Sequence, residues 1–285
     1  MPELPEVQTT VDGLNRTVRG RKMVGVSTSY NSSFYKGKEE IKNPEFFKKF
    51  KKKIIGQKIL KAQRRAKNVL IHLSNRETIL VHMKMTGHFV YDHPETRFIR
   101  LDFKLDNGKH LVLSDMRKFA KVTLAKTSEL EKSRHLEHLG PEPLGKNFQF
   151  TIFNLQIQKK PRGKIKQVLM DQSLIAGIGN IYSDEILWRS GVHPLSRPDR
   201  IPEQNLRAMF KAIKETLRKG IDFGGDSMSD YRNIRGEKGN FQNHHHAYRQ
   251  ISRACIKKGC RGVIKRIIVG TRSAHFCSIH QKLFT

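Results

Sequence analysis

The segment 238–285 is short and strongly basic, and it holds all three cysteines of the chain. It contains ten Lys or Arg residues and no Asp or Glu, so it can hardly build a hydrophobic core of its own. Its thiols and one imidazole follow the pattern Cys255-x4-Cys260-x16-Cys277-x2-His280. Three thiolates and an imidazole form a tetrahedral zinc ligand set, and metal binding would provide the folding free energy. We therefore predict one structural Zn²⁺ in a small ribbon, with unligated cysteines and a surface histidine as the alternative.

The whole chain is also basic. Of its 285 residues, 55 are Lys or Arg and 26 are Asp or Glu, which gives a formal net charge of +29. Such a charge favours a polyanionic partner, nucleic acid first and an acidic membrane second, over a merely solvated basic surface. No apolar run approaches the ~18 residues of a membrane span, and residues 1–7 lack the apolar region of a secretory signal. The few, late cysteines predict a reducing, cytoplasmic location.

The first half of the chain predicts one helix followed by antiparallel sheet. A helix is expected over 5–19, because Val7, Val11, Leu14 and Val18 recur at helical spacing. Five short runs with alternation, β-branched residues and turn signals follow and predict a meander or sandwich. These runs are Val69–Leu73, Thr78–Met83, Phe98–Phe103, His110–Ser114 and Lys121–Ala125. We therefore expect residues 1–138 to form the N-terminal domain.

A change of pattern marks the start of a second part. The stretch 139–150, which begins with clustered Gly and Pro, is predicted to be a linker. Helical patterns recur beyond it and predict a helical domain over 151–240. The expected helices cover 165–170, 181–190 and 202–219.

The remaining residues, 241–285, are expected to form the metal ribbon around a hairpin. Its strands are predicted at Val263–Val269 and Ser273–Cys277, joined across Gly270-Thr271. The chain as a whole is thus expected to be of the α+β class.

The first residues offer one candidate for covalent chemistry. Removal of Met1 would expose Pro2 as a secondary α-amine, and such terminal amines have pKa values near ~8. A partly unprotonated amine forms iminium ions with aldehyde-like carbons, and Glu3 beside it could act as a general acid or base. Judged from these residues alone, an ordinary start of a soluble chain is the simpler interpretation.

Two further groups of residues suit nucleic acid. The motif Gly177–Asn180 opens a predicted helix, where free N–H groups can bind a phosphate, although a tight turn between helices explains it equally well. Met85 and Phe119 lie near cationic residues at strand ends, as do apolar wedges that enter a DNA groove. Core packing is the alternative for each of these two side chains.

Eight ordered motifs extend over essentially the whole chain. They are Met1–Val7, Arg64–Lys67, His82–Gly87, Asp115–Phe119, Leu139–Leu144, Leu169–Ser183, Gly224–Asn233 and the cysteine-rich tail. Together they resemble the formamidopyrimidine-DNA glycosylases of the Fpg/Nei superfamily. The resemblance implies an N-terminal helix with a β-sandwich, a helix-two-turn-helix domain and a zinc ribbon. It also implies a bifunctional enzyme that excises an oxidised purine from double-stranded DNA and cleaves the abasic site by β,δ-elimination.

The resemblance implies roles for four residues of the N-terminal domain. Pro2 corresponds to the nucleophile that attacks C1′ and forms a Schiff base, and Glu3 to the acid/base that protonates the sugar ring oxygen. Glu6 matches an acidic residue that supports the site. Lys67 is implied to hold a phosphate near the lesion and to belong to the catalytic set.

The resemblance also implies contacts to DNA elsewhere. Asn180 and Arg272 would hold phosphates close to the lesion. Met85, Arg117 and Phe119 would fill the space left by the extruded base, with Arg117 facing the orphaned cytosine.

The segment 224–233, which contains Tyr231, resembles a loop that caps 8-oxoguanine through backbone amides, so Tyr231 is counted among the DNA-binding residues. Leu4 stands where members that act on oxidised pyrimidines often have Gly, which favours 8-oxoguanine and formamidopyrimidines as substrates. The protein is expected to be a monomer, associated with the nucleoid through DNA and without a membrane partner.

The chain departs from the family pattern in three places besides its high charge. The first cysteine spacing is four rather than two, His280 stands where a fourth cysteine is usual, and Met116 replaces a proline before Arg117. Two competing interpretations stand beside the main one. The first is a basic ribbon protein that binds DNA or RNA without chemistry, and the second is the same enzyme acting on oxidised pyrimidines.

Overall fold

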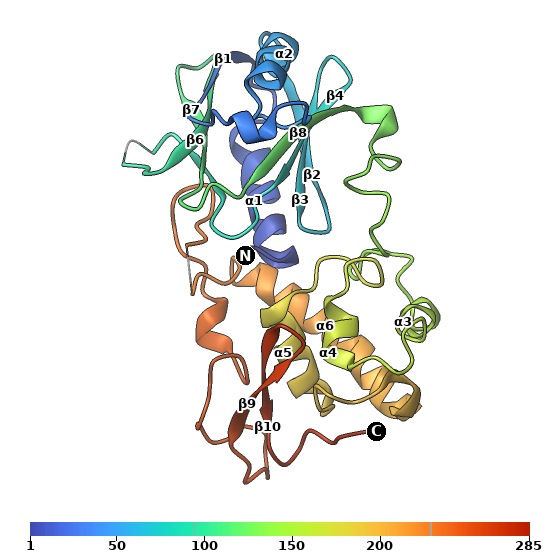
Figure 1. Cartoon of the computed structure of the whole chain (residues 1–285). Coiled ribbons are helices and arrows are strands. Elements are labelled where there is room, and N and C mark those ends of the chain that lie inside the picture. Colours follow the sequence, from blue (N-terminus) through green and yellow to red (C-terminus); the bar gives the residue numbers. More distant parts are fainter. Residues whose placement is uncertain (94, 229) are drawn as a thin grey trace. The chain divides into compact units, whose positions relative to one another are not determined.

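The computed structural model describes residues 1–93, 95–228 and 230–285, which form two compact units (Figure 1). Unit 1 comprises residues 1–137 and 223–240, and unit 2 comprises residues 138–222 and 241–285. The segment 223–240 therefore belongs to unit 1, whereas its sequence position groups it with the helical domain. Within the described residues, no helix has the length and apolar character needed to span a membrane.

Unit 1 is an antiparallel β-sandwich with two α-helices, α1 (Leu4–Thr17) and α2 (Pro44–Ile54). One four-stranded sheet has the order β1-β6-β7-β5, and the other has the order β2-β3-β4-β8. The strands are β1 (Met23–Thr28), β2 (Ile59–Arg65), β3 (Asn68–Leu73), β4 (Glu77–His82), β5 (His88–Tyr91), β6 (Ile99–Leu105), β7 (His110–Ser114) and β8 (Lys121–Lys126). The five runs predicted from alternation correspond to β3, β4, β6, β7 and β8, which confirms the sandwich.

The core of unit 1 lies where the two sheets and α1 meet. Val7, Val11 and Leu14 of α1 are buried against it, as their helical spacing predicts. Strand residues such as Val69 and Leu101 fill the space between the sheets. Because α1 packs on this core along its length, its first turn is held in a fixed position.

The expectation of a single helix in the first half is wrong, because the lysine-rich stretch after residue 42 contains α2. The Asn43 side chain accepts the backbone N–H of Glu45 at 3.1 Å, and Pro44 occupies the first turn, which together start the helix. Phe50 and Ile54 are buried one turn apart and attach α2 to the core of unit 1.

Unit 2 is helical, with a hairpin near its end. Its α-helices are α3 (Phe150–Ile157), α4 (Ile165–Met170), α5 (Asn180–Ser190) and α6 (Glu203–Asp222). The hairpin pairs β9 (Ile264–Val269) with β10 (Arg272–Cys277). Helices α4, α5 and α6 and the hairpin confirm the predicted elements, whereas α3 is not among them. An α+β chain with a sandwich, a helical part and a terminal ribbon is thus confirmed.

Candidate active site and metal centre

The first turn of α1 carries the residues predicted for covalent chemistry. Pro2 is buried immediately before the helix, and Glu3 occupies the position that caps it. The Glu3 backbone N–H donates to Glu6 Oε2 at 2.8 Å, and the Glu3 carboxylate accepts from the Glu6 backbone in return. This reciprocal capping fixes two carboxylates beside Pro2, at the helix end whose dipole stabilises negative charge.

The loop 223–240 is attached to this same turn. The backbone N–H of Asp226 donates to Glu6 Oε1 at 2.7 Å, and the Tyr231 hydroxyl donates to the Glu6 carbonyl at 2.9 Å. Burial is the main reason why the pKa of Tyr231 lies above its ordinary value. Tyr231, predicted to contact DNA, is therefore directed at α1 and serves at least to anchor the loop.

Gly225 makes this attachment tight. Its φ is +86°, and a Cβ there would lie 2.9 Å from Glu6 Cγ and 3.2 Å from Tyr231 Cε1. The loop backbone can approach the Glu6 carboxylate this closely only because residue 225 has no side chain.

Four predicted site residues stand beside three residues with strained backbone. Ala66, Lys84 and Lys118 are non-glycine residues with φ values of 53°, 56° and 58°. They adjoin Lys67, Met85 and the Arg117–Phe119 pair respectively. Left-handed backbone at such residues costs about 1–2 kcal/mol each, and strain of this kind concentrates at functional loops. Lys67 itself is buried in the β2–β3 turn.

The buried carboxylate of Asp115 organises the loop that carries Arg117 and Phe119. Its Oδ2 accepts the Ala120 backbone N–H at 2.7 Å, and its Oδ1 accepts the Thr86 hydroxyl. The Thr86 hydroxyl in turn accepts the Arg117 backbone N–H at 3.1 Å. The network joins the loop after Met85 to the loop before β8, and sequence reasoning assigns Asp115 no role.

At the surface of this loop, the side chains expected to fill a gap in DNA are exposed or half-buried. Phe119 is 47% exposed, Arg117 is exposed, and Met85 is half-buried. The Arg117 guanidinium lies over the Phe119 ring, 4.6 Å from its centroid. Core packing therefore does not explain Phe119, whereas an exposed aromatic ring beside a cation fits contact with bases.

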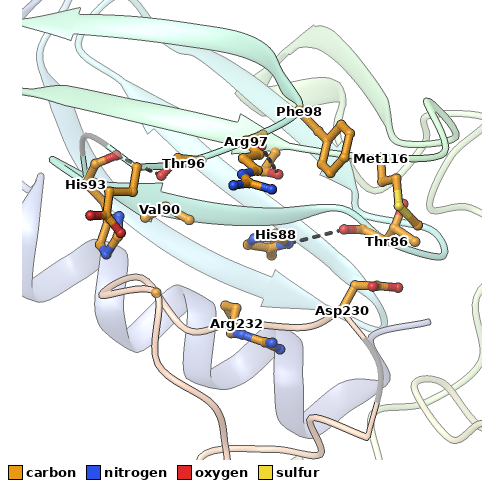
Figure 2. A pocket seen from close by; sticks show the side chains of 13 residues that line it. Thr86, His88, Val90, His93, Thr96, Arg97, Phe98, Met116, Asp230 and Arg232 are labelled. Atoms are coloured by element: carbon orange, nitrogen blue, oxygen red, sulfur yellow. Dashed lines mark hydrogen bonds between the residues drawn. The ribbon is translucent and has the colours of Figure 1, made fainter.

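A cavity of about 400 Å³ lies next to these loops, lined by residues that include Thr86 and Met116. Figure 2 shows His88 with Arg97 on one side and Arg232 on the other. Burial lowers the pKa of His88, and the charge of Arg232 adds to the lowering. Glu95 and Asp230 line the same cavity, so the charges of Arg97 and Arg232 are balanced and the hollow beside these loops is polar rather than cationic.

His82 is a polar residue that sequence reasoning missed. It ends β4 opposite Asn68, the residue after Lys67, and its Nδ1 accepts the backbone N–H of Lys84 at 3.1 Å. Burial, together with the charges of Lys84, Lys67 and Lys121, lowers the pKa of His82 to about 3. In the sequence, the signal for this group of cationic neighbours is that His82 stands two residues before Lys84 at the end of a predicted strand.

In unit 2, Asn180 and Arg272 lie at the starts of α5 and β10. Gly179 precedes α5 in an extended conformation, so Asn180 stands at the N-terminal end of the helix, as the glycine motif predicts. Within the described residues, the Asn180 side-chain oxygen is buried without a hydrogen-bond partner. Arg272 is exposed beside the hairpin turn.

Asp184 connects α5 with β10, and it belongs to a fully buried ion pair. Lys166 Nζ forms a salt bridge with Asp184 Oδ1 and lies 3.4 Å from the Asn180 carbonyl. Asp184 Oδ2 accepts from both the backbone and Nδ1 of His275 on β10, at 2.9 and 2.8 Å. The first turn of α5 and the hairpin that carries Arg272 are therefore held together by one carboxylate.

The four predicted metal ligands are gathered in one cluster. The ligand atoms of Cys255, Cys260, Cys277 and His280 lie within 4.8 Å of one another. Cys255 Sγ is 3.3 Å from His280 Nδ1, and Cys260 Sγ is 3.5 Å from Cys277 Sγ. These separations suit a tetrahedral ion with ligand bonds of about 2.0–2.3 Å, and the three thiols are free rather than disulfide-bonded.

Neighbouring groups orient this cluster for a metal. The Nε2 of His280 lies 2.9 Å from the Trp188 carbonyl, so it carries the proton and leaves Nδ1 unprotonated towards the thiols. Burial raises the pKa of the Cys255 thiol to about 11, whereas the Gly262 N–H lowers that of Cys260. His280 thus takes the place of a fourth thiolate, and the altered first spacing leaves the cluster intact.

Comparison with known proteins was consistent across the chain. Residues 1–122 match the formamidopyrimidine-DNA glycosylase N-terminal domain, and residues 139–232 match the formamidopyrimidine-DNA glycosylase H2TH domain. A formamidopyrimidine-DNA glycosylase of Herpetosiphon aurantiacus is 37% identical over 99% of this chain and 100% of its own length. That of Bacillus subtilis is 33% identical over 98% of each chain.

Solved structures agree with these relatives. A complex between Lactococcus lactis Fpg and abasic-site DNA is 29% identical, with a TM-score of 0.86 over 98% of this chain and 99% of that chain. A MutM complex with DNA containing carbocyclic 8-oxo-G is 29% identical, with a TM-score of 0.86 over 99% and 100% of the two chains. The sandwich, the H2TH match and the Cys3His ribbon define a DNA glycosylase of the helix-two-turn-helix class. The chain belongs to the formamidopyrimidine-DNA glycosylase family.

Proposed function

We propose that the protein excises oxidised purines from double-stranded DNA and then cleaves the strand at the resulting abasic site. The observation that carries the proposal is the arrangement at the start of α1, where Glu3 and Glu6 cap each other beside the buried Pro2. A protein that only bound DNA would have no need of two carboxylates fixed in the residues next to this proline.

Pro2 is the nucleophile of this scheme, once Met1 has been removed. Its secondary amine attacks C1′ of the damaged nucleotide, the bond from C1′ to the base breaks, and the departing base takes up the proton that the amine nitrogen releases. Glu3 donates a proton to the sugar ring oxygen, the ring opens, and the nitrogen lone pair forms the iminium C=N bond. Glu6 positions Glu3 by accepting its backbone N–H at 2.8 Å.

Strand cleavage follows from the iminium. The positively charged C=N bond acidifies the proton at C2′, a carboxylate removes that proton, and the 3′ phosphate leaves in β-elimination. A second elimination then releases the 5′ phosphate, and water hydrolyses the remaining Schiff base to restore the Pro2 amine. Two neighbouring carboxylates allow one group to take a proton while the other remains charged.

Access to the base requires that it leave the helix stack. We infer that Met85, Arg117 and Phe119 occupy the vacated space, and that Arg117 pairs with the orphaned cytosine. Intercalated side chains compensate for lost stacking, which costs a few kcal/mol per step. Lys67, Asn180 and Arg272 would bind the phosphates around the extruded nucleotide, in a salt-dependent manner.

The loop 223–240 supports an oxidised purine as the substrate. The Asp226 N–H binds the Glu6 carboxylate at 2.7 Å, which attaches the loop to the turn that begins at Pro2. A related MutM has been captured with DNA that contains carbocyclic 8-oxo-G, and a Lactococcus lactis relative with abasic-site DNA. We therefore assign 8-oxoguanine and formamidopyrimidines to this chain, which we expect to act as a monomer at the cytoplasmic nucleoid.

The Cys255, Cys260, Cys277 and His280 cluster would hold one Zn²⁺. The ion would supply folding free energy to the ribbon and take no part in the chemistry. Within the ribbon, the metal would fix the hairpin from which Arg272 projects. We propose zinc because thiolate and imidazole donors in a closed four-ligand set favour it.

The decisive experiment traps the iminium. Untagged protein is mixed with a duplex that contains 8-oxoguanine opposite cytosine, and borohydride is added. We expect a covalent protein–DNA adduct that is absent in Pro2→Gly. Duplexes with an abasic site or an oxidised pyrimidine serve as parallel substrates.

Each outcome has a distinct meaning. An adduct with the abasic or pyrimidine duplex but not with 8-oxoguanine would keep the lyase and change the substrate. No adduct with any duplex, from protein that has lost Met1 and still binds DNA, would leave a DNA-binding protein without chemistry. Full activity in protein that retains Met1 would remove Pro2 from the mechanism.

A further inference from the structure

Helix α2 presents a row of lysines that the proposed chemistry does not use. Five of its eleven residues are exposed lysines, and Glu45 is its one acidic residue. The lysines are Lys48, Lys49, Lys51, Lys52 and Lys53. None of them is buried, whereas Phe50 and Ile54 of the same helix are.

Cationic residues from a second segment extend this row. The chain after α2 pairs with the turn after α1, since the Met23 N–H donates to the Gln57 carbonyl at 3.0 Å and Lys22 bridges with Lys58. The exposed cations of the paired segments are Arg19, Arg21, Lys22 and Lys58. We call these four residues and the five lysines of α2 the α2 basic surface.

Few acids neutralise this surface. Among the residues that the structure describes, Lys53 forms a salt bridge with Glu77 at 2.6 Å, and Arg21 lies 4.0 Å from Asp106. Neither acid reaches the lysines in the middle of α2.

Repulsion between neighbouring lysines of the row would destabilise α2 as an isolated helix. Lys48 and Lys52, like Lys49 and Lys53, are four residues apart, and like charges at this spacing destabilise a helix. The negative end of the helix dipole compensates for cations in the last turn, which covers Lys51–Lys53. Lys48 and Lys49 lie outside that turn, and Glu45, three and four residues before them, is the one acid of the helix that can offset their charge. Helix α2 therefore keeps a large positive excess, which a negative partner would neutralise.

The surface is remote from the proposed catalytic residues. Pro2 precedes the first residue of α1, whereas Arg19 and Arg21 follow its last, and the 14 residues of the helix span about 21 Å. Figure 1 shows α2 and the N-terminus at opposite ends of unit 1. One short duplex that reaches Pro2 would therefore leave α2 uncovered.

The chemistry of the surface favours nucleic acid over a membrane. A membrane-binding amphipathic helix places its apolar side chains in the lipid. In α2, Phe46 and Phe47 pack against Phe50 with ring centroids 6.4 and 6.1 Å apart, so the aromatic residues face the protein. What remains exposed is ammonium groups, which suit the regularly spaced phosphates of a duplex.

We propose that the α2 basic surface binds the phosphate backbone of a second segment of double-stranded DNA, without regard to sequence, while the first occupies the Pro2 site. The protein would thereby bridge two duplexes or two distant segments of one. Binding of the second duplex is an additional function of the protein, and it does not depend on the glycosylase reaction.

The test uses the whole protein saturated with an unlabelled short duplex that contains an abasic-site analogue. A fluorescently labelled undamaged duplex is then titrated in, and its anisotropy is followed at several salt concentrations. The variant carries Lys48→Gln, Lys49→Gln, Lys51→Gln and Lys52→Gln, since Gln keeps the helix propensity of Lys. The charge-matched control replaces four lysines outside this surface, Lys132, Lys146, Lys159 and Lys211, by Gln.

We expect the saturated wild-type protein to bind the second duplex, and the α2 variant to bind it about tenfold more weakly or worse. The control should stay within about twofold of wild type, and the salt slope of the variant should fall by about 0.9 for each phosphate that is no longer neutralised. All three proteins should act on a short lesion duplex at the same single-turnover rate.

Equal binding by variant and control, or no second duplex bound by the saturated wild type, would overturn the proposal. Binding to vesicles with anionic lipids that the variant loses, together with unchanged duplex binding, would assign the surface to membranes instead. Failure to bind the abasic-site duplex at all would count against the proposed function. The comparison of variant and control on undamaged duplex would then still decide the role of α2.

Discussion

The Glu6 carboxylate accepts the backbone N–H of Asp226, a residue 220 positions further along the chain, at 2.7 Å. Its other oxygen accepts the N–H of Glu3. One side chain therefore joins the loop 223–240 to the turn that begins at Pro2. A displacement of the loop would shift the Glu6 carboxylate and, with it, the residues beside the proposed nucleophile.

Gly225→Ala tests this connection. The new Cβ would lie 2.9 Å from Glu6 Cγ, so we expect the Glu6 carboxylate to shift and base excision to slow by about 10- to 100-fold. Gly224→Ala is the matched control, because Gly224 also has a positive φ but its nearest neighbour would lie at 3.7 Å. Single-turnover excision of 8-oxoguanine measures both, and equal losses would mean that backbone strain alone is responsible.

Asp115→Asn tests the loop that carries Arg117 and Phe119. The amide cannot accept from Ala120, Tyr30 and Thr86 as the carboxylate does, so we expect a loss of about 2–3 kcal/mol in unfolding free energy. The rate of lesion excision from duplex DNA should fall more than the rate of cleavage at an abasic site in single-stranded DNA. The single-stranded substrate leaves no space in a base stack that side chains must fill. The exposed Asp106→Asn is the control for urea unfolding. Equal loss on both DNA substrates would remove Asp115 from the gap-filling loop.

Metal binding is tested most sharply by the glycine beside the cluster. A Cβ at Gly262 would lie 2.6 Å from Cys277 Sγ, so Gly262→Ala should lose zinc and lower the Tm, as should His280→Ala. His280→Cys should retain one zinc per chain. Gly259→Ala is the control, since it has a positive φ but open space around it. Elemental analysis measures the zinc content and calorimetry measures the Tm. Wild-type protein that contains no zinc after purification would contradict the assignment.

The buried ion pair in unit 2 predicts an asymmetry between two lysines. Lys166→Met leaves Asp184 charged and buried, which should cost about 3–5 kcal/mol in unfolding free energy. Lys160→Met removes the exposed partner of Asp171 and should cost about 0–1 kcal/mol. Denaturant unfolding distinguishes them, and similar costs would show that Asp184 has found another counter-charge.

His82 predicts an acid-sensitive fold. Its pKa falls from 6.5 to about 3 on folding, so between these values the unfolded state binds the extra proton and stability decreases as the pH is lowered. His82→Asn keeps an acceptor for the Lys84 N–H but cannot titrate. The slope of unfolding free energy against pH should then decrease by up to one proton, about 1.4 kcal/mol per pH unit. A slope that stays the same in His82→Asn would exclude His82 as the source.

Local patterns predict the parts of the fold that local physics decides. The strands between Val69 and Ala125 are found from their β-branched residues and turn signals, although β3 is buried along its whole length rather than alternating. Helix α5 ends at Gly191, whose φ of 70° suits a left-handed cap. Helix α2 was not predicted, although its sequence has a capping residue and a first-turn proline (Asn43 and Pro44) and two apolar residues one turn apart (Phe50 and Ile54). The many lysines of this stretch suggest a nucleic-acid-binding segment and draw attention away from its helical pattern. The metal ligands could be found because chemistry restricts their types and spacing.

Long-range placement cannot be obtained in this way. The loop 223–240 follows α6 in the chain, yet it belongs to unit 1 through contacts of Asp226 and Tyr231 with Glu6. Asp115 and Lys166 look like ordinary surface charges in the sequence. Their importance arises from burial and partners, which depend on the complete fold.

The hydrogen-bonding geometry of His280 has a spectroscopic consequence. Trp188, the one tryptophan of the chain, offers its carbonyl to this ligand, and its indole stacks on His246 with ring centroids 4.4 Å apart. Its emission therefore originates from a single place beside the ribbon. The protein contains its own optical reporter, so metal uptake and release can be followed by intrinsic fluorescence in real time without any label.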